Sequence, residues 1–460
     1  MRGSAGLRPR GEYMATQLKD IRITQTLPQG SVTWPLPPRE RPDLPNHETA
    51  TLEAYLNTAP LEDVDIADPL WWETDTNRVY FKRLRDEAPV FFTSVNSNRH
   101  RGFWNVTRWA DVMAVDTNHQ VFSSDAHLGG ITLFDMDPDF IMPMFIAMDP
   151  PKHDVQRKAV NPIVSGTNLA GYEELIRSRT CEVLDSLPRG EAFDWVDKVS
   201  IELTSRMLAT LFGWPQERRR MLTYWSDVST SDPELPGNPG KEERQGILLG
   251  MLQEFTMLWN ERVNAEPTGD LVSMLAHNPA TRNMPPMEFM GNLVLLIVGG
   301  NDTTRNSISG GLYFLNKNPG EYAKLRANPA LVENMVSEII RYQVPLAHMR
   351  RTALQDTVLG GQLIHKGDKV VMWYASANRD ERAVENPDDF IIDRPRARQH
   401  MSFGFGIHRC VGNRLAELQL KILWEEILKR FDTIEVIGEP ERVPSAFVKG
   451  YKSLMVRIPA

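Results

Sequence analysis

The sequence predicts a mainly α-helical protein with a minor β-rich region. Apolar residues recur at helical spacing across residues 165–265, and this periodicity is typical of amphipathic helices. A long apolar segment at residues 290–311 and an amphipathic segment at residues 413–431 predict two further helices. Strand-like segments are shorter and fewer, so helices should make up most of the fold.

The chain divides at about residue 48. Residues 1–48 are rich in proline and show no sustained apolar periodicity, which predicts an extended arm. Residues 49–460 carry the helical patterns, and a chain of 460 residues with 41% hydrophobic content is able to bury a large core. We therefore expect a single domain over residues 49–460.

Two strands and a helix are predicted at the start of this domain. Residues 89–92 and 102–106 are expected to pair as a hairpin, after which Thr107 should cap a helix that includes Trp109. Residues 122–148 lose all periodicity but stay apolar. A long apolar loop of this kind typically covers a site, and the alternative is a loop packed on the core.

Composition excludes several functions. Two cysteines, Cys181 and Cys410, are too few for a disulfide framework or for a multi-cysteine zinc or iron–sulfur site. The net charge of −8 argues against a nucleic-acid partner. Since no run reaches eighteen apolar residues and the N-terminus has no apolar signal-peptide core, we expect a cytoplasmic protein without stable membrane insertion.

The most informative segment is residues 403–412. Its glycines allow a tight turn and close approach to something flat, His408 offers a ring nitrogen, and Cys410 precedes a helical segment. A helix dipole and backbone N–H groups lower the pKa of a thiol at such a place and hold it as a thiolate. The alternative is a buried free cysteine.

Three other patterns contain polar residues at helical spacing. His153 and Arg157 lie four residues apart, as two donors for an anion or as a solvated pair. The segment 299–304 places two glycines, each costing about 1 kcal/mol, and adjacent threonines inside an apolar helix, which indicates either a site or a kinked core helix. Glu338 and Arg341 form an E-x-x-R pair that on its own would be a surface ion pair.

These strings occur in one order: D-P-P-x-H-x-x-x-R, [A/G]-G-x-[D/E]-T-[T/S], E-x-x-R and F-G-x-G-x-H-x-C-x-G. Together they resemble the cytochrome P-450 family, the haem-thiolate monooxygenases, in its bacterial form. The resemblance covers roughly residue 80 to the C-terminus. It implies a helical prism that encloses b-type haem.

The resemblance assigns a role to each pattern. Cys410 would bind the iron, and the haem contacts would be His153, Arg157, Gly299, Arg351, Phe403, Gly404, His408, Cys410 and Gly412. The histidines and arginines would meet the propionates, with Arg350 as a competing choice for Arg351. Glu338 and Arg341 would brace the cysteine loop together with a residue near 394–396.

The glycine-containing helix would cross the haem on the side opposite Cys410. Gly299 and Gly300 would leave a groove for O2 and substrate, and the Thr303 hydroxyl could bond to the Gly299 carbonyl or turn toward oxygen. Asp302 and Thr303 would act as an acid–alcohol pair that delivers protons to the outer oxygen atom.

Thiolate ligation implies the reaction class, because an electron-rich sulfur favours O–O cleavage over reversible oxygen storage. The expected reaction inserts one atom of O2 into an unactivated C–H bond. The chain has no flavin or iron–sulfur motif, so electrons from NAD(P)H would arrive through a separate 2Fe-2S ferredoxin and its reductase. An acidic ferredoxin would suit a basic area composed of Lys152, Lys158, Arg394, Arg396, Arg398, Arg409 and Arg414.

Substrate contacts are expected from Leu295, Gly299, Leu346 and Ala347, which predict a hydrophobic substrate. Residues 298–307 and 346–353 look like the bacterial alkane hydroxylase branch, which oxidises the terminal methyl of medium-chain alkanes and, in some members, fatty acids. A steroid or terpene hydroxylase is the nearest alternative. Outside this class, the alternatives are a haem sensor without turnover and a cysteine-nucleophile hydrolase.

Overall fold

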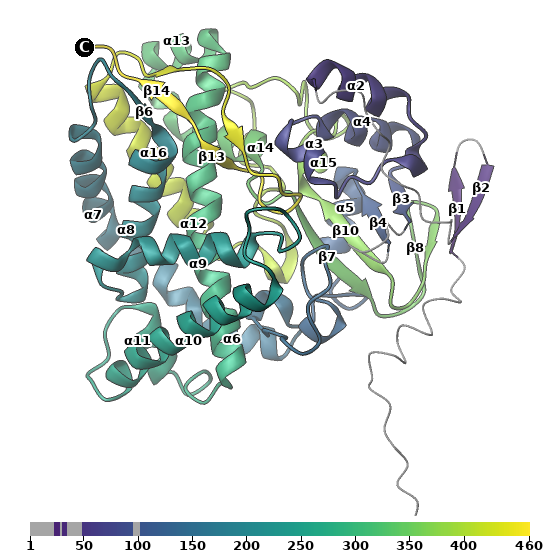
Figure 1. Cartoon of the computed structure of the whole chain (residues 1–460), viewed down its shortest axis with the longest axis horizontal. Coiled ribbons are helices and arrows are strands. Elements are labelled where there is room, and N and C mark those ends of the chain that lie inside the picture. The colour runs from purple at the N-terminus through teal and green to yellow at the C-terminus, as the bar shows by residue number, and fades with distance from the viewer. Residues whose placement is uncertain (1–22, 28–29, 35–47, 95–101) are drawn as a thin grey trace, which may run out of the picture.

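The computed structural model describes residues 23–27, 30–34, 48–94 and 102–460. Helices fill one half of the molecule, and most strands gather in the other half beside a small group of N-terminal helices (Figure 1). The predicted mainly helical fold with a minor β-rich region is confirmed. Most of the expected arm, residues 1–48, lies outside the described residues, and its two described pieces pair as an antiparallel hairpin.

The α-helices are α2 (Thr49–Thr58), α3 (Pro69–Glu73), α4 (Asn77–Glu87), α5 (Trp109–Asp116), α6 (Lys152–Val160), α7 (Gly166–Asp185), α8 (Glu202–Phe212), α9 (Arg220–Thr230), α10 (Lys241–Val263), α11 (Leu271–His277), α12 (Pro286–Lys317), α13 (Pro319–Ala327), α14 (Val332–Gln343), α15 (Tyr374–Ala377) and α16 (Asn413–Arg430). None of these described helices is long and apolar enough to cross a membrane.

The strands are β1 (Ile23–Leu27), β2 (Gly30–Trp34), β3 (Val90–Thr93), β4 (Phe103–Val106), β5 (Phe122–Ser123), β6 (Ala192–Asp194), β7 (His348–Ala353), β8 (Thr357–Leu359), β9 (Gln362–Ile364), β10 (Lys369–Trp373), β11 (Glu435–Val436), β12 (Glu441–Arg442), β13 (Tyr451–Ser453) and β14 (Met455–Arg457). The largest sheet has the order β3-β4-β10-β7-β5.

The predicted hairpin is present as β3 and β4, which pair antiparallel from Val90 with Val106. The predicted cap on the next helix is wrong. Thr107 donates its hydroxyl hydrogen bond back to the Pro89 carbonyl at 2.9 Å, and the first N–H of α5, from Trp109, donates instead to Asp380 Oδ2 at 2.9 Å. A distant carboxylate therefore satisfies the helix N-terminus.

Helix α12 runs through the helical half, and its glycines decide how closely its neighbours pack. A Cβ on Gly300 would lie 2.6 Å from Leu208 Cδ2 of α8, and one on Gly311 would lie 2.7 Å from Ile339 Cδ1 of α14. Both contacts are too short for real side chains. Gly300 therefore permits the approach of α8, and it also lines the cavity together with Gly299, as expected.

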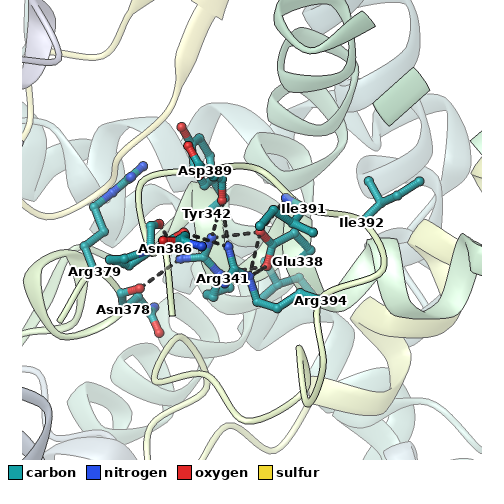
Figure 2. A network of polar contacts seen from close by, with 12 residues as sticks. Glu338, Arg341, Tyr342, Asn378, Arg379, Asn386, Asp389, Ile391, Ile392 and Arg394 are labelled. Carbon is teal, nitrogen blue, oxygen red and sulfur yellow. Dashed lines mark hydrogen bonds and ion pairs between the residues drawn. The ribbon is translucent and has the colours of Figure 1, made fainter. Parts of the chain in front are cut away.

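A buried ion network joins α14 to the loop that follows α15 (Figure 2). Arg341 donates to both oxygens of Glu338 at 2.7 and 2.8 Å, and Arg394 Nε donates to the same carboxylate at 3.0 and 3.1 Å. The remaining guanidinium hydrogens reach backbone carbonyls, including Asn378 and Asp389. Arg394 is thus the partner expected near residues 394–396, and all three side chains are buried.

The same region positions the cysteine loop. Asn378 donates to Ser402 Oγ at 2.9 Å and accepts from the Met401 N–H at 2.7 Å, while Ser402 donates to the Ile340 carbonyl of α14 at 2.8 Å. Since Phe403 follows directly, the network around Glu338 determines where the loop begins.

Replacing Glu338 with Gln should destabilise the protein by about 3–5 kcal/mol, because two buried guanidinium groups lose the charge that compensates them. Chemical denaturation monitored by circular dichroism measures this loss. Glu333→Gln is the matched control on the same helix, since Glu333 pairs with Lys421 at the surface and its loss should cost about 0–1 kcal/mol. Equal stabilities for the two variants would contradict the role of the network.

Candidate functional site

A cavity of about 810 Å³ lies where α12, β7 and the cysteine loop meet. Cys410 and His408 border it from the loop, Gly299 and Thr303 from α12, and Arg351 from β7. The sequence predicted a site from each of these segments separately, and the fold brings all of them to one cavity.

The cysteine loop has the tight turns that its glycines predicted. Gly404 and Gly406 have φ values of +63° and +66°, which side-chain-bearing residues rarely adopt. The Cys410 N–H closes the loop by donating to the Phe403 carbonyl at 2.8 Å, and α16 begins three residues later. Gly404, Phe403 and Gly412 all line the cavity.

The Cys410 thiol differs from the sequence expectation in its acidity. Desolvation by the surrounding protein raises its pKa above the ordinary value although the residue borders two hollows, and this effect exceeds the opposite effects of the Gly412 N–H and of Arg157 and Arg409. The helix terminus therefore does not lower the pKa of Cys410 enough to hold it as a thiolate by itself. A bound metal cation would stabilise the thiolate directly.

Two buried histidines in mutual contact have ring nitrogens without hydrogen-bond partners among the described residues. These atoms are both nitrogens of His408 and Nε2 of His153. His408 lines the cavity, and His153 does not line it but packs against His408. The two rings meet edge to face with centroids 4.4 Å apart, and burial is the main reason that the pKa of His408 falls to about 2. Buried polar atoms are rarely left without partners, which indicates a ligand with hydrogen-bonding groups here.

Two arginines complete this polar part of the wall. Arg157 and Arg351 line the cavity, and Arg157 also donates to the Arg409 carbonyl. The choice between Arg350 and Arg351 is decided by strand alternation. Arg350 points to the other side of β7 and pairs with Asp135 at 2.6 Å, and it does not line the cavity. Two histidines and two arginines therefore fit the carboxylates of a haem.

Asp116 is a site residue that the sequence analysis missed. It is buried at the end of α5 and accepts hydrogen bonds from Arg351 at 2.9 Å, from the Tyr374 hydroxyl at 3.1 Å and from the Phe405 N–H at 2.7 Å. It thus fixes both an arginine of the cavity and the cysteine loop. No local pattern marks it, because all three partners come from distant segments.

The cavity face of α12 is open at Gly299. A Cβ built there would meet no described atom within 4 Å, and the Thr303 hydroxyl donates to the Gly299 carbonyl at 2.8 Å. One of the two geometries expected for Thr303 is therefore the one observed. Its side chain lines the cavity and is free to turn toward a ligand.

Asp302 is on a different side of α12 from Thr303, since successive helical residues are about 100° apart. Its carboxylate accepts from Arg305 at 2.9 Å and from Asn301 at 2.8 Å, and it does not line the cavity. Burial raises its pKa to about 6, against the lowering effect of Arg305. Arg305 also binds the exposed Asp227 of α9 at 2.8 Å, so this acid is connected toward solvent and not to Thr303 directly.

Of the two substrate contacts expected just before β7, only one has its side chain in the cavity. Leu346 lines the cavity, as does Leu295 from α12. Ala347 does not, and this expectation is wrong: its N–H donates to the Phe447 carbonyl at 2.9 Å, its carbonyl accepts from the Ala375 N–H at 3.0 Å, and it is fully buried in the core. His348 and Met349 line the cavity instead.

The predicted covering loop lines the cavity with apolar side chains that include Ile131, Leu133, Phe134, Met136, Phe140 and Met142. Side chains of the sheet hold it in place. The Leu133 N–H donates to His348 Nε2 at 3.0 Å, and Lys369 donates to the Leu133 carbonyl at 2.8 Å. The loop is therefore both packed on the sheet and part of the cavity wall.

Cys410 also lines a second, more open depression at the surface. Four of the cations predicted for a basic area line it, namely Arg396, Arg398, Arg409 and Arg414. Arg394 does not, because it is buried in the ion network of Glu338. Lys152 lies elsewhere and pairs with Glu288 at 2.5 Å.

Comparisons with known proteins agree with this geometry. The model of the family described as "Cytochrome P450" matches residues 243–456. The solved structure of Cytochrome P450-153 from Novosphingobium aromaticivorans is 47% identical with a TM-score of 0.80, covering 86% of this chain and 99% of that one. CYP153D17 from Sphingomonas sp. PAMC 26605 gives the same values.

A curated relative, linalool 8-monooxygenase of Pseudomonas putida, is 36% identical over 409 residues, which are 86% of this chain and 99% of the relative. The family match, over residues 243–456, includes the cysteine loop, the glycine-containing helix and the buried ion network. The chain therefore belongs to the cytochrome P450 family, and it is a bacterial cytochrome P450 monooxygenase.

Proposed function

We propose that this monooxygenase hydroxylates the terminal methyl group of medium-chain alkanes or fatty acids with electrons from a 2Fe-2S ferredoxin. The observation that carries the proposal is the apolar wall around Gly299. Leu295 and Leu346 line the cavity together with the apolar covering loop, and Thr303 is the hydroxyl on the same face of α12. Such a wall suits the hydrocarbon part of a substrate.

Haem held by Cys410 would supply the cleavage of O2, which an electron-rich thiolate favours. His153, Arg157, Arg351 and His408 would bind its propionates through the ring nitrogens and guanidinium groups described above. The protein itself then binds the haem and the substrate, orients the substrate and keeps water away from the reacting atoms. The apolar loop excludes water, Gly299 leaves space beside the reacting atoms, and Thr303 holds a proton on its hydroxyl.

Terminal attack requires positioning, because secondary C–H bonds are weaker than those of a methyl group. The cavity wall must therefore admit the chain end and keep the internal carbons away. Bulky side chains that line the same cavity as Gly299, among them Leu295 and Leu346, would provide this restriction. Leu346 belongs to the 346–353 segment that resembles the alkane hydroxylase branch, and Leu295 lies three residues before the other such segment, 298–307.

A second candidate is a terpene or steroid hydroxylase. The sequence similarity to two relatives supports this candidate. One is linalool 8-monooxygenase, and the other is a steroid C26-monooxygenase of Rhodococcus jostii (strain RHA1), which is 31% identical over 86% of this chain and 84% of that protein. The two candidates differ in the shape of substrate that the cavity accepts.

For electron delivery, we propose that the ferredoxin binds at the depression beside Cys410. Arg396, Arg409 and Arg414 give this face a positive charge in a chain whose net charge is −8, whereas the charge of Arg398 is compensated by Glu417. An acidic partner would be steered to it, and the short path to Cys410 suits electron transfer.

The purified protein, reconstituted with ferredoxin, reductase and NAD(P)H, should convert decane and dodecanoic acid mainly to terminally hydroxylated products. Gas chromatography with mass spectrometry of the products measures the ratio of terminal to internal attack. Linalool and a sterol serve as competing substrates in the same assay. Faster turnover of either one would favour the second candidate over the first.

Cys410→Ser should abolish the ferrous carbonyl spectrum that is characteristic of a thiolate ligand, because the hydroxyl is a much weaker donor to iron. Absorption spectroscopy of the reduced, carbon-monoxide-treated protein shows this directly. Cys181→Ser is the control, since Cys181 lies on α7 and contacts Glu426 at 3.5 Å, outside the cavity. A wild-type spectrum from Cys410→Ser would refute the proposed ligand.

Thr303→Ala should keep haem binding but lower the yield of product per NAD(P)H by about 10-fold or more, with hydrogen peroxide released instead, because the hydroxyl proton donor is lost. Parallel assays of cofactor oxidation, product and peroxide measure this coupling. Thr303→Ser retains the hydroxyl and should stay close to wild type. Unchanged coupling in Thr303→Ala would show that protons reach the oxygen by another route.

A further inference from the structure

Arg244 is a cation in the cavity wall that the proposed mechanism does not use. It lies in the first turn of α10 and lines the same cavity as Thr303 and Cys410. One of its terminal nitrogens donates to the Ser229 carbonyl at the end of α9. Its Nε is buried and has no hydrogen-bond partner among the described residues.

Among the described residues, Arg244 has no carboxylate within ion-pair distance, and nearby charged side chains pair with one another. Lys241 pairs with Asp137 at 3.0 Å, and Gln245 donates to the same carboxylate at 2.8 Å. Asp232 is the acid whose charge acts on Arg244, and one of its oxygens accepts the Glu234 N–H at 3.0 Å. Asp137 is thus already neutralised by its own partners.

An arginine in this position is destabilised in the absence of a ligand. Burial lowers the pKa of Arg244 below its ordinary value, which means that the charged form is poorly solvated. The unmet Nε–H adds to this cost. A carboxylate would supply both the opposite charge and an acceptor, and the arginine fork is suited to bind it through two hydrogen bonds.

The surroundings of Arg244 change from polar to apolar along α10. Leu248 lies one turn further along the helix, on the same face, and also lines the cavity. Phe140 of the covering loop and Leu295 of α12 continue the apolar lining. A ligand with a charged head and a long hydrocarbon tail matches this sequence of contacts.

We propose that Arg244 binds the carboxylate of a fatty acid, so that the hydrocarbon chain extends along the apolar wall with its methyl end toward Thr303. This inference rests on the proposed function and selects fatty acids over alkanes within it, because an alkane has no group for Arg244. The arginine is a specificity-determining residue, and Asp232 competes with the ligand for it.

The test is isothermal titration calorimetry of the full-length, haem-loaded protein with sodium dodecanoate and with methyl dodecanoate. Arg244→Gln should weaken dodecanoate binding by about 10- to 100-fold and leave binding of the uncharged ester close to wild type. Asp232→Asn, which removes the competing charge, should tighten dodecanoate binding. Arg457→Gln is the control, because Arg457 is an exposed arginine that pairs with Glu435 outside the cavity.

Each outcome separates this inference from the proposed function. Equal losses for acid and ester in Arg244→Gln, or no loss for either, would overturn the carboxylate site and leave the hydroxylase proposal intact. If the wild-type protein binds neither probe, the carboxylate site is overturned, and the hydroxylase proposal is then restricted to alkanes, which the product assay with decane tests separately. A change in Asp232→Asn toward weaker dodecanoate binding would also count against the site.

Discussion

The carboxylate of Glu338 sits between Arg341 and Arg394 without access to water, and the position of the cysteine loop depends on this arrangement. Removing three charged groups from water is unfavourable, so the network is stable only because nearly all its hydrogen bonds are made. The guanidinium groups use their remaining hydrogens on the carbonyls of the loop between α15 and Arg394. The ions therefore fix a segment of irregular backbone that has no strand or helix of its own.

The fixed loop between α15 and Arg394 in turn positions the cysteine loop at the cavity. Asn378 and Ser402 hold the start of the cysteine loop, and Asp116 holds its middle through the Phe405 N–H. Asp116 also binds Arg351, so the loop and the polar wall share one anchor. The unpaired ring nitrogens of His408 lie in that wall, and the ring of His153, whose Nε2 is also unpaired, packs against His408. The cavity is thus polar where a haem's carboxylates would lie and apolar where a hydrocarbon would.

Helix α12 shows how one element meets several demands. Its glycines weaken the helix by about 1 kcal/mol each relative to alanine. Gly300 and Gly311 offset this by allowing α8 and α14 to pack closely, whereas Gly299 leaves open space in the cavity. On the remaining side, Asp302 is paired with Arg305 and faces α9. One helix therefore packs against α8 and α14, leaves space for a ligand at Gly299, and holds Asp302, an acid connected toward solvent, on another face.

The sequence by itself determined the features that depend on neighbours a few residues apart. The E-x-x-R pair and the tight turns at Gly404 and Gly406 follow from helical spacing or from backbone preference, and the same spacing limited the Thr303 hydroxyl to two geometries, of which the bond to the Gly299 carbonyl is observed. The motif order also predicted the family and the helical fold. Only the tertiary structure decided which distant groups meet: Arg394 with Glu338, Asp116 with Arg351, Leu208 with Gly300, and Ala347 with the core instead of the cavity. These contacts join residues far apart in the chain, and their geometry depends on the packing of whole elements, which no local pattern encodes.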